Sequence, residues 1–387
     1  MKHSSAPALA PALATRPHRN PFTPTFGVTP PVLAGRDHEI REFQEALADG
    51  PGSPGRAILV AGARGTGKTV LLNAIEQAAR REGWLVVAAT ARPGVAAELA
   101  QDILPTLLAE HDPGAVTSRV TGVGVSALGF GGSVARQTDQ RHKITPGFRS
   151  QLARLARIQA EAGGGVLVTL DEVHRLARAD LREIAQGVQH AFRDGLEVAF
   201  VGAALPSAAQ AATDDAVVTF LRRAERFALG RVGDAAVALA LSQPISRSGR
   251  SITPEALEVA VAATHGYPFF VQMVGHQVWS VDRKAKVIDA GQARVGAARA
   301  VERAHRLIHA PAVADVSDRD RAFLEAMAQD QAVSRISDVA ARLGVTLGYA
   351  GRYRARLIAA ELVEPAGRGL VRFAMPFLGD YLRGADA

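Results

Sequence analysis

The sequence of 387 residues contains no cysteine, and this absence excludes several kinds of site. A disulfide framework, a thiolate metal centre and a cysteine nucleophile all need the thiol group. No apolar run approaches the roughly 18–20 residues that a membrane helix requires. The only apolar stretch near the N-terminus is short and broken by Pro7 and Pro11, so it makes a poor signal peptide. We therefore expect a cytoplasmic protein without a membrane partner.

The composition is that of an ordinary globular protein, with 48% apolar and 21% charged residues. The length is sufficient for two or three domains. A net charge of +7 and a sequence pI of about 10.2 favour polyanionic partners, which bind basic proteins through phosphate neutralisation. The alternative is that the arginines only decorate solvated faces. Charge by itself leaves both interpretations open.

Short apolar runs alternate with helical patterns between residues 31 and 231. Buried strands that alternate with helices are typical of a parallel sheet covered on both faces. The expected fold class of this region is therefore α/β. The runs predicted to be strands lie at residues 57–61, 84–89, 165–170 and 196–201.

Three other regions differ from this α/β core. Residues 1–30 are rich in proline and predict a flexible lead-in. Residues 232–312 show helical patterns only, and Pro311 marks their expected end. A glycine-rich stretch at residues 117–135 predicts a hairpin that reaches nucleic acid, a subunit-contact surface or an ordinary insertion. These three alternatives stay open.

A complete P-loop pattern, G-x-x-x-x-G-K-[ST], follows the first predicted strand as Gly62-Ala63-Arg64-Gly65-Thr66-Gly67-Lys68-Thr69. The glycines let successive backbone N–H groups curl around phosphates. Lys68 is expected to neutralise the β- and γ-phosphates, and the Thr69 hydroxyl to ligate Mg²⁺. The predicted helix that follows adds its positive N-terminal dipole. We therefore expect the chain to bind ATP and Mg²⁺.

Two acidic residues, Asp171 and Glu172, end the strand predicted at residues 165–170. A carboxylate at the tip of a buried strand lies beside a P-loop, so Asp171 is predicted to hold Mg²⁺ with Thr69. Glu172 is then placed to polarise a water for attack on the γ-phosphate. An exposed acidic turn is the structural alternative. The pair is the arrangement expected of hydrolytic P-loop ATPases.

Two further motifs make residues 31–387 resemble the AAA+/STAND group of P-loop ATPases, particularly the origin-recognition-like and archaeal-type ATPases. Upstream of the P-loop, the segment Leu33–Glu39 resembles the hydrophobic-hydrophobic-Gly-Arg-acid-x-Glu motif of that group. The resemblance implies that Arg36 and Glu39 lie near the adenine. Gly266-Tyr267-Pro268 resembles the Gly-x-Pro of a helical lid, which implies that Gly266 and Pro268 contact the nucleotide.

The resemblance also implies a domain order of ATPase core at residues 31–231, helical lid at 232–312 and winged helix at 313–387. The sequence departs from the group after the strand at 196–201, where a polar sensor residue is expected. Gly202-Ala203-Ala204 stands there instead, and Ser207 and Gln210 are imperfect substitutes. Hydrolysis is therefore expected to be slow.

Members of this group often use an arginine that acts on the nucleotide of a neighbouring subunit. Arg223 and Arg226 lie near the end of the core, where such arginines occur. They are candidates for this catalytic role in a homo-oligomer. Solvated or salt-bridged arginines are the alternative interpretation.

The last 75 residues predict three helices and then two short strands, the pattern of a winged helix-turn-helix. If this domain binds double-stranded DNA, the expected contacts are Tyr349, Arg352, Tyr353 and Arg356 on the third helix, with Arg368 on the wing. From residue 313 onward, however, ten arginines face ten acidic residues. A protein-facing or structural role is the equal alternative.

Two functional hypotheses follow from these patterns. In the first, the chain is an ATPase that uses ATP binding and hydrolysis as a conformational switch and acts on DNA. In the second, it is a signalling switch with a protein partner and no direct contact to DNA. The absent polar sensor favours the second slightly. A small-molecule kinase is a poor third, since a winged helix has no place in it.

Overall fold

The computed structural model describes residues 19–25, 27–112, 147–206, 209 and 219–384. The glycine-rich stretch at 117–135, both Ser207 and Gln210, and the first 18 residues of the expected lead-in lie outside these ranges. Within the described residues, no helix combines the length and the apolar character needed to cross a membrane.

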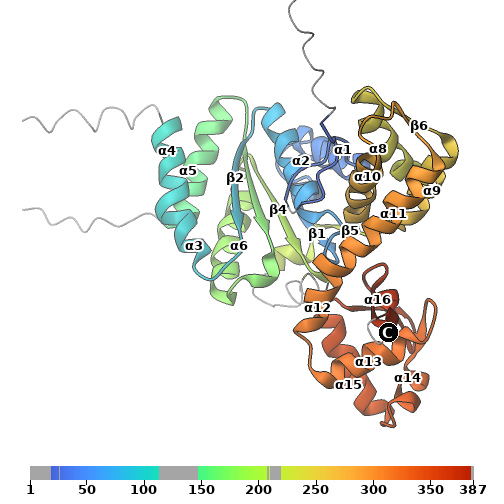
Figure 1. Cartoon of the computed structure of the whole chain (residues 1–387). Coiled ribbons are helices and arrows are strands. Elements are labelled where there is room, and N and C mark those ends of the chain that lie inside the picture. Colours follow the sequence, from blue (N-terminus) through green and yellow to red (C-terminus); the bar gives the residue numbers. More distant parts are fainter. Residues whose placement is uncertain (1–18, 26, 113–146, 207–208, 210–218, 385–387) are drawn as a thin grey trace, which may run out of the picture.

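The α/β core contains a five-stranded parallel sheet in the order β2-β3-β4-β1-β5 (Figure 1). This confirms the expected fold class. Strand β4 separates the P-loop strand β1 from β3, so the P-loop and the acidic pair come from strands that are not neighbours. The strands are β1 (Ala57–Gly62), β2 (Leu85–Thr90), β3 (Val166–Asp171), β4 (Val198–Ala204) and β5 (Glu225–Leu229).

Helices cover both faces of the sheet, because its apolar side chains alternate between them. Ile58 and Val60 pack toward α1 and α2, whereas Leu59 between them packs toward α3 to α6. Burial of each such side chain stabilises the fold by about 1.5–3 kcal/mol. The helical elements of the core are α1 (Asp37–Ala48), η1 (Pro54–Arg56), α2 (Lys68–Arg81), α3 (Val95–Glu98), η2 (Leu99–Ile103), α4 (Leu104–His111), α5 (Phe148–Glu161), η4 (Val173–Arg175), α6 (Arg178–Arg193) and η5 (Thr219–Arg222).

The lid packs four helices around a core of its own. The expectation of an all-helical lid was wrong in one detail, because Ser251–Ile252 pairs in parallel with Val287–Ile288. These two-residue strands are too short to leave a β pattern in the sequence. The lid elements are α8 (Asp234–Arg247), β6 (Ser251–Ile252), α9 (Pro254–Thr264), α10 (Pro268–Val281), β7 (Val287–Ile288) and α11 (Ala290–Ala304).

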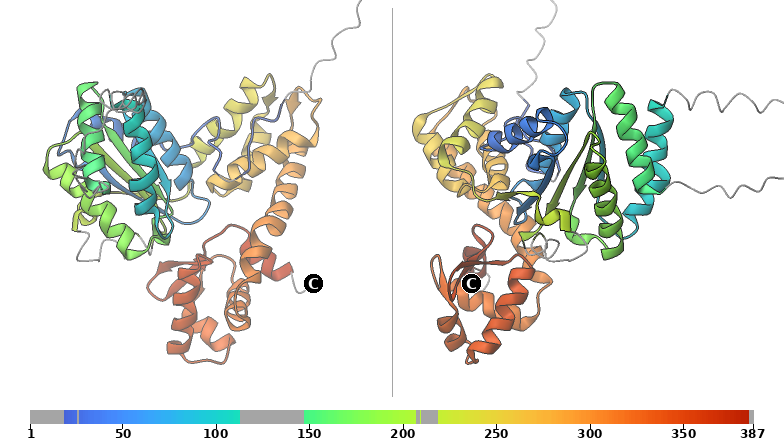
Figure 2. Two further views of the ribbon diagram at one scale, coloured as in Figure 1. Left: turned by 90° about the vertical axis from the view of Figure 1, so that its left-hand side faces the viewer. Right: turned by 180° about the vertical axis from the view of Figure 1, so that it is seen from behind.

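A continuous helical path leads from the lid into the C-terminal segment (residues 313–384 of the structure). Helix α11 passes through the π-helical turn η6 (His305–His309) into α12 (Ala310–Ala314) (Figure 2). Pro311, the expected boundary, therefore does not end the helix. It is the second residue of α12 and comes directly after the π-helical turn η6.

The C-terminal segment has the element order helix, strand, helix, helix, two-stranded hairpin and final helix. Its three-stranded antiparallel sheet has the order β8-β10-β9. Strand β8 and a final helix, α16, were not expected from the sequence. The elements are α13 (Asp318–Ala328), β8 (Ser334–Arg335), α14 (Ile336–Arg342), α15 (Leu347–Ala359), β9 (Val363–Gly367), β10 (Leu370–Phe373) and α16 (Leu378–Gly384).

Candidate functional site

The P-loop (residues 62–69) connects β1 to α2, and its backbone needs glycine at three places. Gly65 and Gly67 have φ angles of 77° and 90°, in the left-handed region that favours glycine. A Cβ atom at Gly65 would lie 2.8 Å from Cε1 of Tyr267. One at Gly62 would lie 2.5 Å from Oγ1 of Thr66. The pattern of the sequence is thus matched by the geometry of the loop.

Lys68 is the first residue of α2, and its ammonium group crosses the loop. Its Nζ donates to the carbonyl oxygens of Gly62 at 2.7 Å and Ala63 at 3.0 Å. Burial lowers the pKa of Lys68, while the carboxylates of Glu361 and Asp171 raise it. The group is therefore a half-buried cation above the N-terminus of a helix, where phosphate oxygens bind well.

Thr69 and Asp171 lie together, as the sequence predicted for a magnesium site. The Thr69 hydroxyl donates to Oδ2 of Asp171 at 2.6 Å, which joins α2 to the tip of β3. A hydroxyl and a carboxylate are hard oxygen ligands of the type that Mg²⁺ prefers. These two residues therefore fit the ion that a P-loop site uses with ATP.

Glu172 follows Asp171 in a left-handed conformation with a φ of 55°. Its backbone N–H donates to Oδ1 of Asp171 at 2.8 Å, and its Oε2 lies 2.7 Å from Nη1 of Arg175. Both side chains of this ion pair are more than a third exposed, so the pair is weak and can open at little cost. Glu172 also lines the cavity that contains the P-loop.

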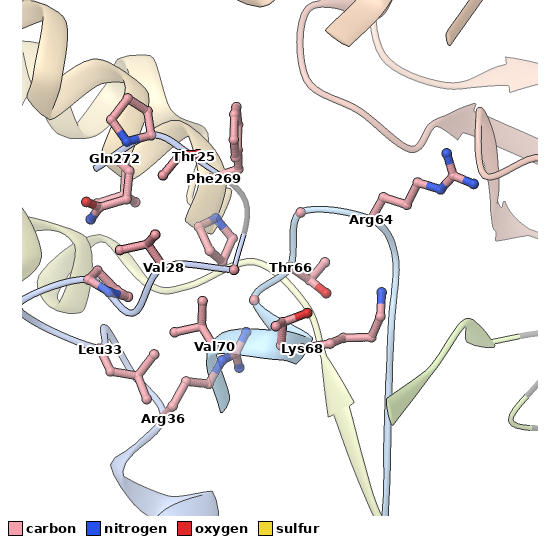
Figure 3. Close-up of a pocket in the computed structure, with 18 of the residues that line it drawn as sticks. Thr25, Val28, Leu33, Arg36, Arg64, Thr66, Lys68, Val70, Phe269 and Gln272 are labelled. Carbon is pink, nitrogen blue, oxygen red and sulfur yellow. The ribbon is translucent and has the colours of Figure 1, made fainter. Parts of the chain in front are cut away.

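This cavity encloses about 660 Å³ and is formed by several regions of the chain (Figure 3). The P-loop forms one wall and the first turn of lid helix α10 another. Of the residues expected near the nucleotide, those that line the cavity are Arg36, Arg64, Gly65, Thr66, Gly67, Lys68, Thr69, Asp171, Glu172 and Pro268.

Four expected nucleotide-binding positions, Glu39, Gly62, Ala63 and Gly266, are not among the residues that line the cavity. Glu39 lies 3.5 Å from Nη1 of Arg36 and holds that side chain, which also donates to the carbonyl of Gly230 at 2.8 Å. Gly266 has a φ of 67°, and its carbonyl accepts from the N–H of Val232 at 2.7 Å. Ala63 contributes its carbonyl oxygen to Lys68. These residues position others rather than lining the cavity.

The N-terminal segment (residues 19–25 and 27–30) forms a wall of the cavity that the sequence did not indicate. Residues 23–25, 27, 28 and 30 line it. Phe22 is buried in the lid core, and Asn20 donates to the carbonyl of His276 at 3.1 Å. Asn73 of α2 donates to the carbonyl of Gly27 at 3.2 Å. This part of the expected flexible lead-in is therefore fixed between the lid and the P-loop helix.

Three further side chains at the site, from the lid and the core, were not among the predicted site residues. The hydroxyl of Tyr267 donates to the carbonyl of Arg64, and burial raises the pKa of this tyrosine. Gln272 lines the cavity and accepts from the N–H of Thr23 at 3.2 Å. His174 of η4 also lines the cavity, and burial lowers its pKa. The Gly-x-Pro motif was the only sequence signal that pointed to this part of the lid.

Comparison with known proteins agrees with this geometry. Residues 32–201 match the family model of the AAA ATPase domain. Residues 32–201 are an AAA ATPase domain. Residues 306–382 match a second family model, described as a domain of unknown function (DUF8462). Among curated proteins, no sequence matches the chain significantly.

Solved structures extend the likeness of fold beyond the AAA ATPase domain. A Walker-type ATPase of Pyrococcus abyssi, PABY2304, is 15% identical with a TM-score of 0.60, over 91% of this chain and 96% of that chain. The ORC2 protein of Aeropyrum pernix, solved as ADPNP and ADP complexes, is 16% identical with a TM-score of 0.60, over 93% and 96%. The chain thus shares its overall fold with these two proteins.

The two arginines predicted to act on the nucleotide of a neighbouring subunit lie outside the cavity that contains the P-loop. Arg223 and Arg226 are exposed, and Arg226 belongs to β5 at the edge of the sheet. Neither is among the described residues that line the cavity. Their role therefore stays a prediction for a neighbouring subunit.

The DNA-contact candidates have different environments within the C-terminal segment. Arg352 and Arg368 are exposed, on α15 and in the hairpin turn respectively. Nη2 of Arg356 lies 2.7 Å from Oδ1 of Asp320, and this ion pair reduces the positive charge that Arg356 could offer to DNA. The prediction was wrong for Tyr353, which is 5% exposed and packs beside Phe323 in the domain core. Its position on the inner face of α15 follows from the helical period.

Phe22→Ala is expected to release the N-terminal segment from the lid and to weaken ATP binding. Phe22 is 2% exposed and packs against Gly275, where a Cβ atom would lie 2.5 Å from its ring. Loss of such a side chain costs about 3 kcal/mol. Hydrogen exchange of residues 19–25 should rise, and titration should show a weaker affinity for ATP. Val287→Ala, at a lid residue that is 51% exposed, is the control. Unchanged exchange in the Phe22 variant would contradict this anchoring role.

Proposed function

We propose that the chain binds and hydrolyses ATP with Mg²⁺ and uses this cycle as a conformational switch. The observation that carries the proposal is the cluster of Lys68, Thr69 and Asp171 within the AAA ATPase domain. Lys68 would bind the phosphates, Thr69 and Asp171 would hold Mg²⁺, and Glu172 would accept a proton from the attacking water. Magnesium supplies charge neutralisation at the phosphates when bound.

The shared walls of the cavity support a role as a switch. A nucleotide in the cavity would touch the P-loop, lid helix α10 and the N-terminal segment at once. Ligands shift a conformational equilibrium when their contacts differ between its states. An ATP molecule that bridges three parts of the chain has such contacts available. The ORC2 protein of A. pernix, which is similar in fold, has been solved as ADPNP and ADP complexes.

Phosphate release from ATP, measured with and without Mg²⁺, tests the enzymatic part of this proposal. We expect magnesium-dependent release that is slow, because no polar side chain stands at Gly202, Ala203 or Ala204 in β4. Failure of the chain to bind ATP would contradict the proposal. ATP binding with no release would leave a nucleotide-occupancy switch as the function.

We further propose that the C-terminal segment presents α15 and the β9–β10 hairpin to double-stranded DNA. The supporting observation is the exposed face of α15, where Arg352 lies over the ring of Tyr349 at 5.5 Å from its centroid. An arginine on a recognition helix can reach phosphates or base edges in the major groove. Arg368 in the hairpin turn would contact the backbone. A protein-binding role is the alternative, since residues 313–387 carry ten arginines and ten acidic residues.

Arg352→Ala is expected to weaken DNA binding and to lower the slope of log affinity against log salt by about one. The physical reason is the loss of one phosphate neutralisation. Fluorescence anisotropy with a labelled duplex at several salt concentrations provides the measurement. Arg247→Ala removes an exposed arginine from the lid and should bind as the unaltered chain does. DNA binding that is absent, or insensitive to salt, would favour the protein-partner alternative.

A further inference from the structure

Glu361 stands at an unusual backbone position between α15 and β9. The helix ends with hydrogen bonds from Glu361 N to Ile358 O and from Leu362 N to Leu357 O, each 3.0 Å long. In this kind of helix ending, the residue after the C-cap is left-handed and is usually glycine. Glu361 has a φ of 59° there. A residue held in such a disfavoured conformation persists only where its surroundings fix it there.

The carboxylate of Glu361 is buried against the P-loop. Its side chain is 6% exposed, and its Oε2 lies 3.2 Å from Nε of Arg64. Neither carboxylate oxygen makes a well-aligned hydrogen bond within the described part of the chain. Figure 3 shows Arg64 directed away from the other cavity residues, toward the ribbon of the C-terminal segment. A buried carboxylate with so few partners depends on nearby positive charge.

The cations near Glu361, Lys68 and Arg64, are the ones that would bind the phosphates of a nucleotide. Burial raises the pKa of Glu361, while Lys68 and Arg64 lower it. In turn, Glu361 is the carboxylate that raises the pKa of Lys68 most, against the effect of burial. A carboxylate of the C-terminal segment and the phosphates of a nucleotide would therefore compete for the same two cations.

We propose that Glu361 is a nucleotide-sensing residue that docks the C-terminal segment on the P-loop and is driven off when ATP binds. This inference rests on the proposed ATP-dependent switch and names its moving part. ATP brings several negative charges to Lys68 and Arg64, and like charges held this close repel strongly in a partly buried site. Because Glu361 directly follows α15 and precedes β9, its displacement moves the proposed DNA-reading helix and the hairpin together.

The other contacts of the C-terminal segment give this movement a direction. Phe377 packs on His265 and Phe270 of the lid, with ring centroids 4.7 Å and 5.3 Å apart. His309 of η6 lies 6.0 Å from the ring of Tyr381. These apolar and aromatic contacts do not compete with phosphate. Loss of the Glu361 contact therefore frees the segment from the P-loop while it stays attached to the lid.

The test uses the full chain with Glu361→Gln and Glu361→Gly. Both changes remove the charge, and glycine also suits the left-handed backbone, so a folding defect is not expected. We expect ATP to bind about tenfold more tightly to both variants, the size expected for one like-charge repulsion at a half-solvated site. Without nucleotide, their small-angle scattering should shift toward that of the unaltered chain with a non-hydrolysable ATP analogue.

Glu364→Gln is the matched control, because Glu364 is a carboxylate of the same segment that pairs with Arg372 rather than with the P-loop. It should leave both measurements unchanged. If the unaltered chain binds ATP but the Glu361 variants match it in affinity and scattering, the sensing role is overturned and the proposed function stands. If the unaltered chain does not bind ATP, both proposals fall.

Discussion

Lys68→Ala is expected to weaken ATP binding at least about 100-fold and to remove hydrolysis, since charged hydrogen bonds to phosphate are among the strongest in proteins. The Gly62 and Ala63 carbonyls hold the ammonium of Lys68 across the P-loop before any phosphate contact is made. No other lysine lines the cavity within the described residues, and Arg64 of the same loop pairs with Glu361 instead of crossing the loop. Titration with a fluorescent ATP analogue and a phosphate-release assay measure the two effects.

The loss in the Lys68 variant must be separated from unfolding. Burial lowers the pKa of Lys68, so its ammonium is not in its most favourable environment, and the melting temperature of the variant shows whether the chain stays folded without it. Lys286→Ala removes an exposed lysine from the lid and should keep full ATP affinity. A Lys68 variant that melts normally and binds ATP as the unaltered chain does would contradict the assignment of this cavity.

The phosphate end of the site could be predicted because its parts are local in the sequence. The P-loop sits between a buried strand and a helix, and Asp171 ends another buried strand. Parallel strands bring their carboxyl ends to one edge of a sheet, so two distant motifs could be placed together. The observed hydrogen bond between Thr69 and Asp171 is the result of that rule.

The remaining parts of the site could not be predicted, because they depend on tertiary packing. The N-terminal segment joins the cavity through Phe22 in the lid core and Asn73 on α2, neither of which belongs to a motif. Glu361 reaches the P-loop from 297 positions away in the sequence relative to Arg64. Proline content alone suggested flexibility, whereas one buried phenylalanine was enough to fix the segment.

Edge strand β5 was missed for a different reason. Its sequence, ERFAL, begins with two charged residues and buries only Phe227 and Leu229. An edge strand has one side open to solvent, and charge there protects it from pairing with other chains. The resulting pattern resembles the end of a helix or a loop more than it resembles a buried strand.

Glu172→Gln is expected to keep ATP affinity and to reduce hydrolysis about 10²- to 10⁴-fold, the usual contribution of a general base. Glutamine has nearly the same shape, and it is no more strained than glutamate at the φ of 55°. The companion variant Arg175→Ala removes the ion pair at Glu172 but keeps the carboxylate. Because that pair is exposed and weak, the Arg175 variant should change hydrolysis far less.

The Glu172 and Arg175 variants together distinguish the two forms of the proposed switch. If turnover drives the cycle, Glu172→Gln should hold the chain in its ATP-bound arrangement. Phosphate release would then be absent in a single-turnover experiment. Scattering recorded at successive times would show that the chain does not return to its nucleotide-free arrangement. If nucleotide occupancy is sufficient, the unaltered chain should already persist in that arrangement for as long as the variant does. Equal hydrolysis by the Glu172 variant and the unaltered chain would show that this carboxylate is not the base. The acidic pair would then serve only to place Asp171 beside Thr69.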